Sequence, residues 1–194
     1  MARPREFDEE EALAKAARVF RRNGYHNSSM QELVAETGVC RASLYETYGD
    51  KHALYLKALD HYRKATKEAI EAAARQGTPT EKLRAVYALV VGTFVGQAAR
   101  EGCFMTSAML EMLPEHLQTV GPVVSENMAT LETVFTTIVR EGIATGEFRT
   151  DLPVAATVRF LISVVGGLNV LGKVQPDVTA LTEVVDVALR SLQA

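Results

Sequence analysis

The spacing of the apolar residues is the feature that most constrains this chain, because it is helical along nearly the whole length. Leu13, Ala16, Ala17 and Phe20 occupy the i, i+3, i+4 and i+7 positions of one helix face. Similar stripes recur in the second half, and no stretch alternates polar and apolar residues as a half-buried strand does. We therefore expect an all-α protein.

Capping signals divide the first part of the chain into four expected helices. A third, short helix would run from Arg41 to Tyr48, and a long helix would follow it. The start and stop signals are Asn23-Gly24, Ser28-Ser29 with Glu32, Gly38, Gly49 and Asp50.

The second half predicts five further helices after a break at 76–79, so about nine in all. They would cover about 80–100, 103–112 and 121–142, with the last two beginning near Pro153 and Pro176. The segment 153–172 is long enough to span a bilayer and holds a single charged residue, Arg159. Polar residues and three glycines interrupt it, so a helix buried on most sides is favoured over a membrane contact.

Charge and composition narrow the function classes without selecting one. The net charge of −3 argues against nonspecific nucleic-acid binding, although residues 1–75 carry 13 Lys and Arg against 12 Asp and Glu. The N-terminus lacks the apolar core of a signal peptide, which predicts a cytoplasmic protein. Cys40 and Cys103 are far apart, and the four histidines show no metal-ligand spacing, so neither a metal nor a cofactor is expected.

The segment from Ser28 to Tyr48 has the form of a helix-turn-helix. Leu33, Val39 and Leu44 are spaced to pack its two helices together. In such a unit the second helix lies in the major groove of DNA with its first residues against base edges, where a long cation can bind guanine. The residues of this helix left to point outward are Arg41, Ala42, Ser43, Tyr45 and Thr47.

The stretch GVCRASLYETY at 38–48, followed by Lys51, resembles the GVSxxxLYxxF-and-Lys signature of the TetR family of repressors. The resemblance spans Leu13 to about Leu59, and the run GCFMTSAMLE at 102–111 is similar to a segment of some members. It implies an N-terminal three-helix DNA-binding domain, residues 1–50. A long helix would join it to a helical effector-binding and dimerisation domain, residues 51–194.

The resemblance also implies roles at single positions. The first three residues of the recognition helix would face base edges, and the other contacts would be to phosphates, helped by the positive helix ends. The residues expected to contact double-stranded operator DNA are Ser28, Ser29, Arg41, Ala42, Ser43, Tyr45, Thr47 and Lys51.

Cys40 departs from the family pattern, which often has Ser at this N-cap. Sulfur accepts hydrogen bonds weakly, so the cap should lose about 1 kcal/mol at most. Two interpretations stay open: a small residue in a weak cap, or a redox switch beside the DNA.

The C-terminal half is expected to bind a small apolar or amphipathic effector and to form a homodimer. Methionine side chains suit adaptable apolar sites, although the helical spacing of each candidate is equally consistent with packed core. The pocket candidates are Phe94, Cys103, Met105, Met109, Met112, Met128 and Phe135. The last two helices would form a four-helix bundle with those of a second subunit. The dimerisation candidates are Leu161, Val165, Leu168, Leu171, Leu181, Val184, Val185 and Leu189.

These features predict a ligand-responsive repressor that binds a near-palindromic operator as a dimer. Three alternatives compete with it. One is a redox-responsive repressor that senses through Cys40 or Cys103, and another is a helical adaptor that does not bind DNA. The third is a thiol hydrolase built from Cys103, His116 and Glu111, which no sequence pattern orders into a site. An enzyme is therefore not expected.

Overall fold

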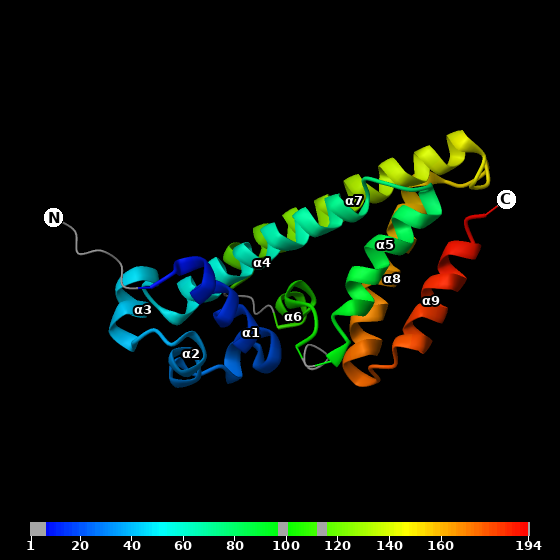
Figure 1. Cartoon of the computed structure of the whole chain (residues 1–194). Coiled ribbons are helices and arrows are strands. Elements are labelled where there is room, and N and C mark those ends of the chain that lie inside the picture. Colours follow the sequence, from blue (N-terminus) through cyan, green and yellow to red (C-terminus); the bar gives the residue numbers. More distant parts are fainter. Residues whose placement is uncertain (1–6, 97–100, 112–115, 194) are drawn as a thin grey trace.

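The computed structural model describes residues 7–96, 101–111 and 116–193. These residues form nine α-helices and no named strand, which confirms the expected all-α architecture (Figure 1). The helices are α1 (Glu9–Asn27), α2 (Met30–Thr37), α3 (Arg41–Tyr48), α4 (Lys51–Ala73), α5 (Pro79–Gly92), α6 (Phe104–Leu110), α7 (Leu117–Thr145), α8 (Val154–Val174) and α9 (Val178–Arg190).

Two apolar cores lie at opposite ends of the molecule. The first packs α1, α2 and α3 against the first half of α4, α6 and the start of α7. The second joins α5, α8 and α9 to the rest of α7 and the end of α4. Helices α4 and α7 lie along one another and connect the two ends (Figure 1). Since α4 contributes to both cores, it belongs physically to both halves, and the division at residue 50 stays a prediction.

The helix boundaries follow the capping signals. Asp50 caps α4, with its carboxylate accepting from the Ala53 amide at 2.7 Å. The structure departs from the expected bounds where α5 ends at Gly92 rather than near residue 100 and where α7 begins at Leu117 rather than near residue 121. It also differs at Gly24, where α1 kinks at φ 78° and ψ 173° and then continues to Asn27. Glycine permits this backbone conformation because it has no Cβ.

Helices α8 and α9 each carry two apolar stripes. Most of the predicted dimer residues lie on the stripe that faces the chain's own core, so the prediction was wrong for them. The core-facing stripe is buried within the same chain. Five dimerisation candidates belong to it and are unavailable to a second subunit: Leu161, Leu168, Leu181, Val185 and Leu189. Val165 lines a cavity within the same chain, so only Leu171 and Val184 remain exposed.

The second stripe leaves an exposed apolar face on α8 and α9. Phe160, Leu171 and Val174 on α8 are 42%, 50% and 82% exposed, and Val184 and Val187 on α9 are 37% and 60% exposed. Within the described residues, α8 is also the helix that is long and apolar enough to cross a membrane, by length and composition. An apolar face of this size on two neighbouring helices is typical of a subunit interface.

Candidate nucleic-acid interface

The N-cap residue of α2 is Ser29 rather than Ser28. The Ser29 hydroxyl accepts from the Glu32 amide at 3.1 Å, and the Glu32 carboxylate accepts from the Ser29 amide at 2.8 Å. This capping box confirms the sequence signal. The hydrogen bonds of this box lower the pKa of Glu32, and the bond from the Ser29 backbone has the largest effect. Ser28 is buried and donates to the Gly24 carbonyl oxygen at 2.6 Å, so its predicted phosphate contact is wrong.

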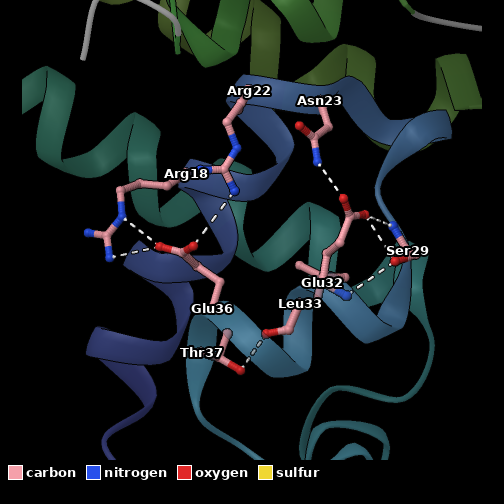
Figure 2. A network of polar contacts seen from close by, with 8 residues as sticks. All are labelled: Arg18, Arg22, Asn23, Ser29, Glu32, Leu33, Glu36 and Thr37. Atoms are coloured by element: carbon pink, nitrogen blue, oxygen red, sulfur yellow. Dashed lines mark hydrogen bonds and ion pairs between the residues drawn. The ribbon is translucent and has the colours of Figure 1, made fainter. Parts of the chain in front are cut away.

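Polar contacts between α1 and α2 hold the first helix of the motif in place (Figure 2). Arg18 and Arg22 both reach the Glu36 carboxylate, at 3.4 and 3.6 Å, and Asn23 donates to Glu32 at 3.2 Å. Each pair is partly exposed and adds little stability alone. Together they fix the angle of α2 on α1, which the sequence pattern did not indicate because the partners are far apart in sequence.

The turn between α2 and α3 depends on Thr37 and Gly38. The Thr37 hydroxyl donates to the Leu33 carbonyl oxygen at 2.7 Å and accepts from the Val39 amide at 3.2 Å. Gly38 has φ 73°, a left-handed conformation that favours glycine, and its amide donates to the Val34 carbonyl oxygen. Val39 is buried beside Leu33, so the turn is anchored as the sequence predicts.

The recognition helix α3 presents its predicted contact residues outward. Leu44 and Tyr48 are buried, whereas Arg41, Ala42 and Tyr45 are exposed. Ser43 and Thr47, the other two candidates, are half-buried at the edges of this face.

Arg41 and Tyr45 form a pair on this face. The guanidinium lies 5.4 Å from the centre of the Tyr45 ring, and its Nη2 donates to the Tyr45 hydroxyl at 3.3 Å. This contact holds a long cation and a hydroxyl side by side at the surface. The DNA contacts of both residues stay predictions.

Cys40 is exposed and makes no side-chain cap bond to α3, as expected for a thiol at an N-cap. Its Sγ lies 3.2 Å from the Ser43 hydroxyl. This placement does not test the redox interpretation, which stays a prediction.

Glu46 is an exposed residue of α3 that the sequence pattern did not single out. It lies on the recognition helix between two predicted phosphate contacts, Tyr45 and Thr47. A carboxylate there repels phosphate, and it is also the group that accepts a hydrogen bond from the amino group of cytosine in the major groove.

Lys51 lies where the end of α1 meets the start of α4. Its Nζ is 4.6 Å from the centre of the Tyr25 ring and 3.5 Å from the His26 carbonyl oxygen. Partial burial lowers the pKa of Lys51, and nearby Glu32 opposes that shift. The ammonium is thus held by the fold beside the N-terminus of a helix, a position suited to an anion.

An aromatic cluster that no sequence pattern indicated lies behind Lys51. The rings of His52 and His116 stack at 4.4 Å, and the Tyr25 ring meets both edge-on. His52 Nε2 lies 3.0 Å from the Thr119 hydroxyl, while its Nδ1 is buried with no hydrogen-bond partner among the described residues. Burial, followed by the charge of His116, lowers the pKa of His52, and Asp50 opposes them.

This cluster predicts that the protein loses stability in mild acid. Below pH 6.5 His52 becomes protonated in the unfolded chain. In the folded protein, where its pKa is lowered, His52 stays neutral at the same pH. The unfolding free energy should therefore fall as the pH drops from 6.5 toward the lower folded pKa. Urea unfolding across this range should show a flatter pH dependence for His52→Asn. A His52→Asn slope equal to that of the wild type would contradict the prediction.

A separate apolar cavity of about 270 Å³ lies among α4, α5, α6, α7 and α8. Of the predicted pocket residues, Cys103 and Met105 line it. Phe94 and Phe135 are buried in the second core, and Met128 packs against the first core. Met109 is 45% exposed, and Met112 lies outside the described residues. The pocket prediction was therefore wrong for Phe94, Met109, Met128 and Phe135, because helical spacing does not separate core from cavity wall.

Comparisons with known proteins agree with this geometry at both ends of the chain. The family model described as "Bacterial regulatory proteins, tetR family" matches residues 12–58, and that described as "Tetracyclin repressor-like, C-terminal domain" matches residues 79–188. The chain is 29% identical to the uncharacterized HTH-type transcriptional regulator YezE of Bacillus subtilis (99% of this chain, 100% of that one). It is 25% identical to the HTH-type transcriptional repressor ComR of Escherichia coli (97% and 90%).

A similar fold is also known in complex with DNA. A cysteine mutant of the TetR family transcriptional regulator CifR, complexed with 26-bp double-strand operator DNA, superposes with a TM-score of 0.81. The two chains are 27% identical, and the match covers 98% of this chain and 100% of that one.

Proposed function

The chain belongs to the TetR family of DNA-binding transcriptional regulators, and we propose that it is a dimeric repressor released from a near-palindromic operator by a small effector. Members of this family are regulators rather than enzymes, so the thiol hydrolase alternative is dropped. The observation that carries the proposal is the exposed face of α3. Arg41, Ala42 and Tyr45 point outward there from a helix anchored by Leu44.

The exposed apolar face of α8 and α9 supports the dimer. Phe160 and Val164 of α8 and Val184 and Val187 of α9 border one shallow groove on this face. A second copy of the same face would cover it and form a four-helix bundle. The recognition helices of the two subunits would then lie one DNA turn apart, roughly 34–36 Å or a multiple of it.

Helix α4 connects the effector cavity to the recognition helix. Tyr62, Thr66 and Ile70 of α4 line the cavity, and Lys51 at its start lies near the predicted DNA surface. The segment around α6 adds two further links to α1. Arg21 reaches Glu101 at 3.0 Å and the Gly102 carbonyl oxygen at 2.9 Å, and the Glu111 carboxylate accepts from the Tyr25 amide at 2.7 Å. An effector that binds better to a splayed dimer would shift the population away from DNA.

Two substitutions test the DNA-binding assignment through different observables. Operator sequences are first selected from random duplexes with the wild-type protein. Because the dimer carries each substitution twice, Arg41→Ala should then cost about 1–3 kcal/mol in binding per subunit and relax specificity at one base position of each half-site. Lys51→Ala should weaken all sequences about equally and reduce the salt slope by about 2, one for each subunit. Fluorescence anisotropy over a salt series separates the two effects.

Glu68→Ala on α4 is a suitable control, because it changes an exposed residue far from α3. A helical adaptor that does not bind DNA would select no sequence and would be indifferent to both substitutions, which would overturn the assignment.

A further inference from the structure

Glu46, on the recognition helix α3, is an acidic residue without a partner in the described part of the chain. Residues 29–48 contain three carboxylates. Glu32 is held by the capping box and by an asparagine of α1, and Glu36 is held by two arginines of α1 (Figure 2). Glu46 is exposed and makes no hydrogen bond or ion pair with any described residue. A free carboxylate on a surface that faces a polyanion lowers the affinity unless it makes a contact of its own with the DNA.

Glu46 lies on the outermost line of α3. Leu44 and Tyr48 are buried and mark the side of the helix that faces the protein. At about 100° per residue, Glu46 lies roughly 180° around the helix from the midpoint of that pair. Tyr45 and Thr47, the two predicted phosphate contacts, lie on either side of it. A helix in the major groove turns its flanks to the phosphates and its outermost line to the base edges, so we expect Glu46 to face bases.

Ala42 leaves the space that Glu46 needs. The two residues are four apart, so they share one side of α3, and both are exposed. Helical side chains lean toward the N-terminus of their helix, which directs the Glu46 carboxylate over the short Ala42 methyl group. The Arg41 guanidinium lies against Tyr45 instead, with its Nη2 at 3.3 Å from the Tyr45 hydroxyl. The carboxylate is therefore directed toward the first turn of α3, which lies closest to the base edges.

A carboxylate can select one base by the pattern of donors and acceptors in the major groove, because it only accepts hydrogen bonds. Guanine offers two acceptors there, thymine an acceptor and a methyl group, and adenine an acceptor beside its amino donor. Cytosine offers its amino group alone. We propose that Glu46 is a specificity-determining residue whose carboxylate accepts a hydrogen bond from the amino group of a cytosine in each half of the operator. The inference deepens the proposed function and rests on it, since it needs an operator-binding dimer.

Selection of operators from random duplexes, with the full chain and three variants, tests the inference. The wild type should select cytosine at one position of each half-site. Glu46→Gln should select adenine there, because an amide can donate to adenine N7 while it accepts from the adenine amino group. Glu46→Ala should accept all four bases at that position and keep the wild-type choice elsewhere. Glu68→Gln on α4 removes the same charge from an exposed residue far from α3, so it should keep the wild-type selection throughout.

Fluorescence anisotropy measures the size of the effect. Replacing this C·G pair by T·A in one half-site should weaken wild-type binding about tenfold, the effect of one mismatched base pair. The same replacement should barely change the affinity of Glu46→Ala. Both Glu46 variants should melt at the wild-type Tm, because the side chain has no partner within the described part of the chain. A clearly lower Tm would contradict that description of Glu46.

The inference is wrong if Glu46→Gln and Glu46→Ala select the wild-type sequence, or if the position that they alter holds a base other than cytosine in the wild-type operator. Failure of the proposed function looks different. In that case the wild type would select no near-palindromic operator at all, whereas failure of this inference alone leaves an operator that depends on Arg41 but not on Glu46.

Discussion

Val187→Glu should convert the protein to a monomer and weaken operator binding by about 10²- to 10⁴-fold, the gain that linking two half-site contacts provides. Val187 is 60% exposed on the apolar face of α9, so the isolated subunit tolerates a carboxylate there. In a two-fold interface the same substitution would bury two charges near one another without partners. Sedimentation velocity would report the oligomeric state, and anisotropy with selected operator DNA the affinity.

Thr182→Glu is the matched control for this substitution. Thr182 is also exposed on α9 but lies on a different side of the helix from Val184 and Val187. It adds the same charge, so it should leave both the dimer and the operator affinity nearly unchanged. If Val187→Glu stays dimeric with wild-type affinity, the exposed apolar face is not the interface.

Gly24→Ala should destabilise the folded protein by about 3 kcal/mol, a fall in Tm of roughly 6–12 °C for a chain of this size. Two causes add. The backbone at Gly24, with φ 78° and ψ 173°, lies in a region that costs a side chain about 1–3 kcal/mol. A Cβ there would also overlap the Glu111 carboxylate, which accepts the Tyr25 amide and so ties α6 to α1.

Gly146→Ala and a double-mutant cycle separate the two causes. Gly146 has a similar φ of 76°, but a Cβ added there would meet no neighbouring atom within 4 Å, so its substitution should cost only about 1–2 kcal/mol. In a Glu111→Ala background, Gly24→Ala should lose the part of its cost that comes from the overlap. A Gly24→Ala variant no less stable than Gly146→Ala would contradict the role of Glu111.

The helix-turn-helix was predictable because its signals are local. The Ser29 and Glu32 capping box, the left-handed Gly38 and the Asp50 cap each act within a few residues, so the linear order of the chain specifies them. The burial of Leu44 and the exposure of Arg41 follow from the same helical period. The fold class and the recognition helix could therefore be derived before any tertiary contact was known.

What only the tertiary structure decided is which partner each helix face meets. The helical period of 3.6 residues identifies the apolar stripes of α8 and α9, but it does not indicate which stripe faces the chain's own core. The residues predicted to form the dimer therefore lie mostly on the internal stripe. For the same reason Phe135 was predicted to line a pocket, although its side chain is packed in the core. Ser28 is buried and donates to the Gly24 carbonyl oxygen, a contact that the capping signal does not reveal. The sequence by itself determined the helices and the DNA-binding motif, because caps and periods are local. Packing decided which apolar face stays exposed and where the cavity lies, because burial is a property of the assembled helices.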